Sequence, residues 1–290
     1  MLFLVLSILS SFVILIIFKV TEKYDIPVIH PIIINYFIAS GFGYFNAGLT
    51  PEKVAEIPLD WYWPAAFVGS LFVFTFFLIG LSTRKAGIAL TTVASKMSFV
   101  FPMFFSIIID DKDHFSSTKL ILLFMAMVAV FLTVYKKRRK TIESLFIMLL
   151  PAMLFVLLGL ADSIVKFSQT FYIKNETDSS AFSFLTFGFS AFWSIVLIFF
   201  QKNKLSILKP KTLISGILIG LANFGSMYFL INALNALELN NSIVIALNNT
   251  GVVLASVIAA LFIFREKLSL LNRLGIGLSI ATFTILMVFL

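Results

Sequence analysis

Long apolar stretches alternate with short polar breaks along the whole chain. Most of these stretches hold about 20 residues, the length that a helix needs to cross the hydrocarbon core of a bilayer. They are about twice as long as the strands of a membrane β-barrel and lack two-residue alternation, which favours helices. The pattern predicts an all-α integral membrane protein with ten transmembrane helices, at residues 2–20, 27–47, 62–82, 86–109, 117–135, 143–168, 180–200, 212–233, 240–264 and 268–289.

The predicted spans divide five and five around a run of basic residues, Lys136 to Lys140. Because five is an odd number, the second set of helices enters the membrane in the opposite orientation to the first. Two inverted repeats of this kind are the plan of many secondary transporters. We therefore expect a first five-helix repeat at 1–135, a basic linker at 136–142 and a second five-helix repeat at 143–290.

The composition agrees with a membrane protein and excludes several kinds of chemistry. Hydrophobic residues make up 60% of the chain and charged residues 12%, against about 25% charged residues in soluble domains. The chain has no cysteine and two histidines, which excludes disulfides, thiolate metal sites and histidine clusters. It has no phosphate-binding glycine loop and no metal-ligand spacing. We therefore expect no metal, no cofactor and no enzymatic activity.

The basic residues show which loops face the cytoplasm. Most of the 22 Lys and Arg residues lie in loops that follow odd-numbered spans. Under the positive-inside rule these loops are cytoplasmic, and both termini lie outside a plasma membrane that the chain crosses many times. The net charge of +8 therefore reflects membrane orientation and does not indicate nucleic-acid binding.

The predicted span at 86–109 carries Lys96 near its middle. A charge at this depth costs at least ~2.5–3.5 kcal/mol on insertion scales, and the distance to either end makes snorkelling difficult. The ammonium group is therefore expected to face protein or water, either as a structural counter-ion or as a ligand for an anionic substrate group. Pro102 and Pro151 interrupt apolar runs and predict kinked helices.

The sixth predicted span has Gly159, Asp162, Lys166 and Gln169 at spacings that place them on one helix face. Asp162 is the only carboxylate well inside any predicted span. It is therefore, with Lys166, a candidate for proton coupling. It could pair with Lys166 or reach across the helices to Lys96. The alternative is a structural ion pair near the membrane edge.

Amide and hydroxyl side chains at similar depth are candidate substrate ligands. Asn248 and Asn249 lie in the ninth predicted span, Asn223 and Tyr228 in the eighth, and Asn35 in the second. Such groups offer directional hydrogen bonds to a polar substrate. The alternative is helix-to-helix contact, because asparagine amides in lipid seek partners on neighbouring helices.

Several stretches resemble a known family. A charged turn with Glu266 stands between the last two predicted spans, and Pro102 matches a proline often found in the family's fourth span. The chain resembles EamA-type transporters of the drug/metabolite transporter superfamily, most of all at 225–230, 246–253, 264–268 and 275–277. The resemblance implies a ten-helix inverted-repeat carrier with a central cavity that moves small metabolites by alternating access. Family members are usually drawn with cytoplasmic termini, whereas the loop charges here indicate the reverse.

These features favour a secondary active transporter, an exporter or exchanger of a small polar metabolite such as an amino acid or organic anion. Its expected partners are the substrate, membrane lipids and protons, with no nucleic acid. One alternative is a flippase for a lipid or a lipid-linked sugar. Another is a membrane-embedded receptor or assembly protein that transports nothing. A membrane enzyme would need converging acids and bases, and the sequence offers only Asp162 with Lys166.

Overall fold

The structure is a computed structural model that describes residues 1–109, 117–134, 142–199, 204–236 and 241–289. All the regular structure in these residues is helical, which confirms the all-α class. Within the described part, five helical segments are long and apolar enough to cross a membrane, as expected of a helical membrane protein. They are Leu2–Glu22, Leu59–Lys85, Leu149–Phe171, Glu176–Phe199 and Pro210–Ala236. The ten-span count and the inverted repeat stay predictions.

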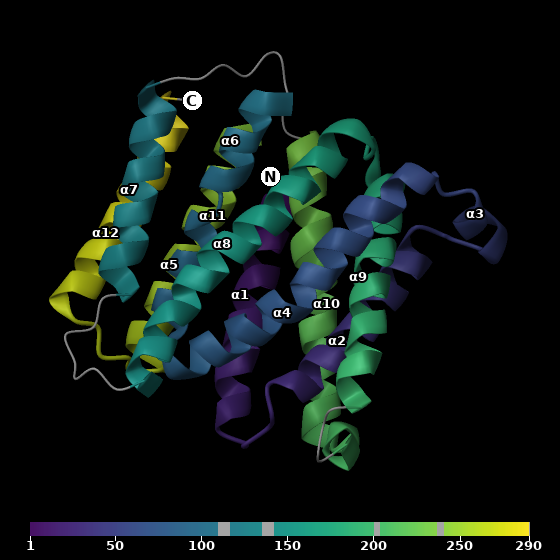
Figure 1. Cartoon of the computed structure of the whole chain (residues 1–290), viewed down its shortest axis with the longest axis horizontal. Helices are drawn as coiled ribbons and strands as arrows, with labels where there is room; N and C mark the ends of the chain where they lie inside the picture. Colours follow the sequence, from purple (N-terminus) through teal and green to yellow (C-terminus); the bar gives the residue numbers. More distant parts are fainter. Residues whose placement is uncertain (110–116, 135–141, 200–203, 237–240, 290) are drawn as a thin grey trace. The chain divides into compact units, whose positions relative to one another are not determined.

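The helices form two compact units (Figure 1). Residues 1–77 and 167–236 make the first unit, and residues 78–166 and 237–290 make the second. Helices α4 (Tyr62–Lys85) and α8 (Ile142–Phe171) contribute residues to both. Each unit therefore combines segments from both predicted repeats. Nearly all of the predicted basic linker lies outside the described residues.

The first unit is built on four long helices, α1 (Leu2–Glu22), α2 (Ile29–Asn46), α9 (Glu176–Phe199) and α10 (Pro210–Ala236). Helix α10 packs against α1, α2 and α9, and α2 also packs against α9. Three short helices complete it: α3 (Pro51–Ala55), η1 (Leu59–Trp61) and η2 (Lys204–Leu208).

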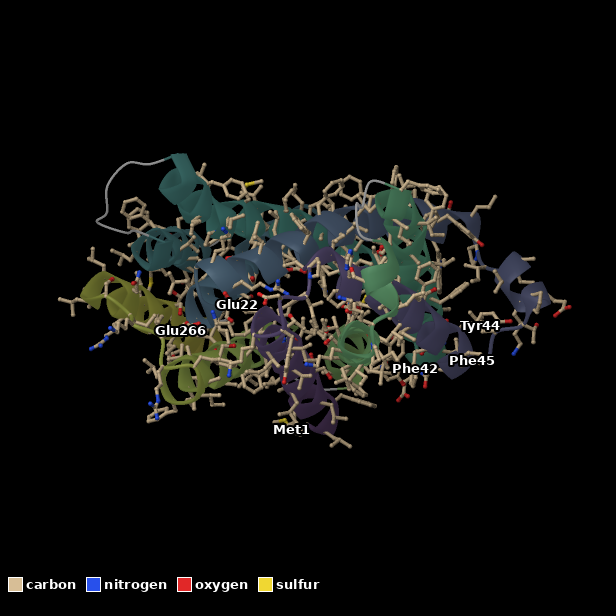
Figure 2. All side chains as sticks on the ribbon, turned by 90° about the horizontal axis from the view of Figure 1, so that it is seen from below. Met1, Glu22, Phe42, Tyr44, Phe45 and Glu266 are labelled. Atoms are coloured by element: carbon tan, nitrogen blue, oxygen red, sulfur yellow. The ribbon has the colours of Figure 1, made fainter. Side chains whose placement is uncertain are left out.

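Aromatic side chains occupy both the interior and the surface of the first unit. The Tyr36 ring is fully buried and lies 5.7 Å from the ring of Phe76 and 6.4 Å from that of Phe187. In contrast, Phe42 and Phe45 on the same helix α2 are 50% and 80% exposed (Figure 2). Exposed aromatic side chains of this kind agree with the membrane character of the protein.

Two glycines bring α10 close to α2. A Cβ atom added at Gly216 would lie 2.5 Å from the Cβ of Ile34, and one at Gly220 would lie 2.8 Å from the carbonyl oxygen of Asn35. The two glycines are four residues apart and share one helix face, the small-residue spacing that allows membrane helices to meet backbone to backbone. Larger side chains at these positions would force the helices apart.

The second unit contains α5 (Ile88–Met97), α6 (Val100–Ile109), α7 (Ser117–Val134), α11 (Asn241–Ile258) and α12 (Leu270–Phe289). A one-turn π-helix, η3 (Ala259–Ile263), extends α11. Helix α7 lies beside α12 (Figure 1), and α5 packs against α7, α11 and α12. Buried apolar side chains join these helices, among them Val93, Met97, Val253 and Phe283.

The apolar run at 86–109 is not one helix but two, because α5 ends at Met97 and α6 begins at Val100. Pro102 explains the break. It lacks the N–H group that would donate to the carbonyl of Ser98 four residues earlier, and its ring crowds that carbonyl. The Phe101 amide donates to the Ser98 carbonyl instead, at 3.0 Å. Pro151, by contrast, lies inside the uninterrupted helix α8.

Candidate functional site

The break between α5 and α6 leaves backbone carbonyls at the end of α5, and one of them takes a partner from α11. Lys96 lies in the last turn of α5, where the negative end of the helix dipole favours a cation. The last carbonyls of a helix have no intrahelical partner and must find another. The Asn249 side chain supplies one, because its Nδ2 donates to the Lys96 carbonyl at 3.3 Å.

Asp162 on α8 lies against the same break. The Ser98 hydroxyl donates to Oδ2 of Asp162 at 3.1 Å, and the Lys96 ammonium interacts electrostatically with the Asp162 carboxylate. Both charged side chains are half-buried. Lys166, four residues further along α8, is also half-buried.

Asn248 adds a buried polar group to this cluster of helices. Its side chain is 1% exposed, and its Oδ1 has no hydrogen-bond partner among the residues that the structure describes. Buried amide oxygens are nearly always hydrogen-bonded in folded proteins. The oxygen is therefore a group that a water molecule or a substrate can satisfy.

In the first unit, Asn35 and Asn223 bond to each other. Asn223 Nδ2 donates to Asn35 Oδ1 at 3.0 Å, and both side chains are buried. Asn223 lies almost one turn beyond Gly220, so the close approach of α10 to α2 brings the two amides together. This contact is the helix-to-helix role that the sequence left open for them. Asn35 Nδ2 keeps no partner within the described residues.

Tyr228, in the second half of α10, contacts an aromatic ring and an acidic side chain. Its hydroxyl donates to Glu176 Oε2 at 3.0 Å, and its ring stacks on Phe224 with centroids 5.2 Å apart and planes at 15°. Glu176 is in the first turn of α9, where the helix dipole favours an acid. The sequence interpretation missed Glu176, although its place just before an apolar run was a usable signal.

The candidate residues thus fall into two sets, each within its own unit. The second unit brings together Lys96, Asp162 and Asn249, with Asn248 on the same helix as Asn249. The first unit holds the other set, Asn35, Asn223 and Tyr228. Nothing in the described geometry links Tyr228 to the Asn35–Asn223 pair by a hydrogen bond.

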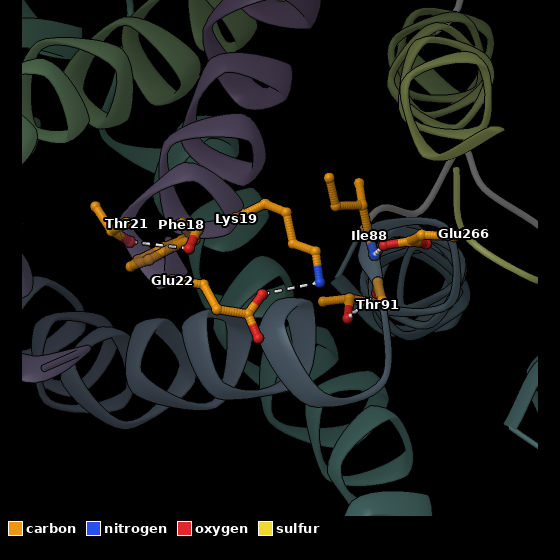
Figure 3. A network of polar contacts seen from close by, with 8 residues as sticks. Phe18, Lys19, Thr21, Glu22, Ile88, Thr91 and Glu266 are labelled. Atoms are coloured by element: carbon orange, nitrogen blue, oxygen red, sulfur yellow. Dashed lines mark hydrogen bonds and ion pairs between the residues drawn. The ribbon is translucent and has the colours of Figure 1, made fainter. Parts of the chain in front are cut away.

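Sequence reasoning also missed two residues of the second unit. Ser98, which bonds to Asp162, stands four residues before Pro102, the position whose carbonyl a proline leaves open. Glu266 accepts a hydrogen bond from the backbone N–H of Ile88 at 2.9 Å (Figure 3). The resemblance had marked its turn but assigned it no role.

Comparison with known proteins gives the extent of similarity but no activity. No family model matches the chain. A Haemophilus influenzae protein described as an uncharacterized protein is 25% identical over 284 residues, which cover 96% of this chain and 94% of the relative. A solved structure titled "Crystal structure of protein" is similar with a TM-score of 0.54 at 12% identity, over 98% of this chain and 99% of that one. The latter likeness concerns the fold alone.

Proposed function

We propose that the chain is a secondary active transporter of EamA type, an exporter or exchanger of a small polar metabolite such as an amino acid or organic anion. The observation that carries the proposal is the helix break after Met97, with Lys96 and Asp162 beside it. Broken helices whose open ends meet charged groups are typical of substrate and ion sites in secondary transporters. The proposal includes ten spans in two inverted repeats and a plasma-membrane location with both termini outside.

The free-energy cost of placing charges and open backbone carbonyls in an apolar run supports a functional role for this break. A mid-span ammonium, a mid-span carboxylate and open carbonyls are each unfavourable in an apolar run, and an uninterrupted apolar helix avoids all of them. Ionisable groups retained at such depth commonly mark substrate and ion pathways. The half-buried state of Lys96 and Asp162 leaves both within reach of a small solute.

The residues would divide the work by charge. Lys96 would bind a carboxylate or phosphate of the substrate, while Asn248 and Asn249 would supply directional hydrogen bonds. Asp162 would gain and lose the coupling proton, with Lys166 as a second charge on the same helix face. Binding of an anion at Lys96 would release Asp162 from its counter-ion, which links substrate occupancy to the charge of the carboxylate.

A ligand screen by thermal shift tests the proposal on purified protein. A ligand present at 100 times its dissociation constant stabilises a fold by about 2.7 kcal/mol. We expect anionic metabolites to stabilise the wild type and to lose this effect in Lys96→Met. Lys174→Met is the matched control, because Lys174 is exposed and its ammonium donates to the backbone carbonyl of Thr170 at 2.8 Å.

Each result then points to one class of function. A ligand whose effect depends on Lys96 goes into liposomes, where uptake or exchange supports transport and binding without movement indicates a receptor. Stabilisation confined to phospholipids or lipid-linked sugars indicates a flippase. Equal stabilisation of the wild type and Lys96→Met would falsify the substrate-binding role of Lys96.

A further inference from the structure

Helix α5 is held at both ends by one stretch of chain. At its start the Ile88 amide donates to Glu266 Oε1 at 2.9 Å, and at its end the Lys96 carbonyl accepts from Asn249 Nδ2 at 3.3 Å. Glu266 follows η3, and Asn249 belongs to α11, which η3 extends. A helix of 10 residues is marginal on its own, and α5 has no continuation through the break. External partners at its two ends therefore matter.

The start of α5 is shaped to receive a carboxylate. The N-cap residue, Gly87, has no side chain to cap the helix and adopts φ +107°, a region that favours glycine. A Cβ atom at Gly87 would lie 2.7 Å from Glu266 Oε2. Glycine thus leaves open the space that the Glu266 carboxylate fills. The free N–H groups and the positive end of the helix dipole favour an anion there.

The turn after η3 directs Glu266 to this place. The amide of Phe264 donates to the Ala259 carbonyl at 2.9 Å, and the amide of Glu266 donates to the Ala260 carbonyl at 2.8 Å. Between them Arg265 adopts φ +52°, a left-handed conformation that is unfavourable for a residue with a side chain. Such conformations persist where the surrounding structure requires them. The strained turn at Arg265 therefore places the Glu266 carboxylate where it caps α5.

We propose that Glu266 is a positioning residue that, together with Asn249, clamps α5 and so keeps Lys96 beside Asp162. The proposal rests on the substrate-binding role proposed above for Lys96. The clamp makes α5 and the segment from α11 to the Glu266 turn move together. The flexible joint is then the break at Ser98 and Phe99, not the contact between α5 and α11.

The absence of cysteine gives a direct test, because Lys96→Cys introduces the sole thiol. Its reaction rate with a water-soluble charged methanethiosulfonate reports the position of residue 96 in detergent-solubilised protein. Adding Glu266→Ala removes the cap, and loss of an ordinary cap corresponds to about a fivefold change in the open fraction of a helix end. We expect the thiol rate to rise by about that factor.

Three further variants separate positioning from general damage. Glu266→Gln keeps an acceptor oxygen for the Ile88 amide and should restore most of the wild-type rate. Glu266→Asp keeps the charge but is one methylene too short, so its rate should rise; it also serves if Glu266→Ala does not fold. Glu176→Ala is the matched control, since it removes a glutamate that accepts a hydrogen bond in the first unit and should leave the thiol rate unchanged.

Hydrogen exchange provides a readout without the Lys96 substitution. In the wild-type background Glu266→Ala should speed amide exchange in the first turn of α5 by about fivefold, whereas Glu176→Ala should not. Unchanged thiol rates and unchanged exchange in folded Glu266→Ala and Glu266→Asp would overturn the clamp. If the clamp is present but Lys96→Met still binds every stabilising ligand, the positioning of α5 stands and the proposed function fails.

Discussion

The contact between α4 and α9 in the first unit predicts a strong effect of a single methyl group. A Cβ atom at Gly69 would lie 2.4 Å from the Thr186 carbonyl oxygen and 3.2 Å from the Ser190 amide nitrogen. Both neighbours are backbone atoms, so no side-chain rotation can relieve the clash. The Ser190 hydroxyl also donates to the Gly69 carbonyl at 2.9 Å, which fixes the two helices at this distance.

The expected cost of Gly69→Ala follows from three terms. Alanine is better than glycine in a helix by about 1 kcal/mol. Against this, overpacking costs about 1–3 kcal/mol, and separating the helices weakens one buried hydrogen bond worth about 1 kcal/mol. The net expectation is a loss of about 1–3 kcal/mol. Gly41→Ala in α2 is the matched control, because nothing lies within 4 Å of its added Cβ.

Tryptophan fluorescence during thermal unfolding provides the assay. Trp193 is one of three tryptophans in the chain, and its indole donates to the Ser70 hydroxyl at 2.9 Å, directly beside Gly69. One of the fluorescent probes therefore lies at the contact under test. We expect Gly69→Ala to melt below the wild type and Gly41→Ala to melt at or above it. A Gly69→Ala variant as stable as Gly41→Ala would refute the backbone-to-backbone crossing of α4 and α9.

Three more perturbations address the polar groups. Pro102→Ala restores a backbone N–H donor in the run at 86–109, so α5 and α6 should join into one helix. The melting temperature should stay the same or rise, while Lys96-dependent stabilisation by ligand should disappear. Retained ligand stabilisation would contradict the proposed role of the break. Asn223→Ala leaves the buried Asn35 amide without its hydrogen-bond partner and should lower the free energy of unfolding by about 1–3 kcal/mol. Leucine at both Asn35 and Asn223 should lower it by less than the two single changes together, which chemical unfolding measures. Asp162→Asn should retain ligand binding in thermal shift but abolish proton-driven uptake in liposomes; uptake that still follows an imposed pH gradient would remove Asp162 from coupling.

The helices could be predicted from the sequence where their position depends on neighbouring residues alone. Apolar runs of membrane-spanning length gave the helical segments, since only helices satisfy their own backbone groups in lipid. The break before Pro102 also had a local cause, the missing N–H of proline. Pro151 shows the limit of this reasoning, because the same residue type lies within the continuous helix α8.

The partners of the polar side chains were much harder to predict. Asn35 meets Asn223 because Gly216 and Gly220 allow α10 to approach α2. Two glycines four residues apart predict a close helix contact but do not identify the partner helix. Asn249 binds a backbone carbonyl that becomes open only once the helix breaks. Glu266 and Ile88 are 178 residues apart, and no periodicity connects them.

Each unit combines segments from early and late in the chain, so neither unit can finish folding until its late segments have been synthesised. Helix α2 ends at Asn46, yet its packing partner α10 begins only at Pro210. At ordinary elongation rates that interval lasts roughly 10–30 s. Throughout this interval, the Asn35 amide and the part of α2 that packs against Gly216 and Gly220 lack their native partner helix. Early helices of this chain must therefore wait at the insertion machinery or in the bilayer until the later ones arrive, and a fragment that stops before α10 lacks the first unit's central helix.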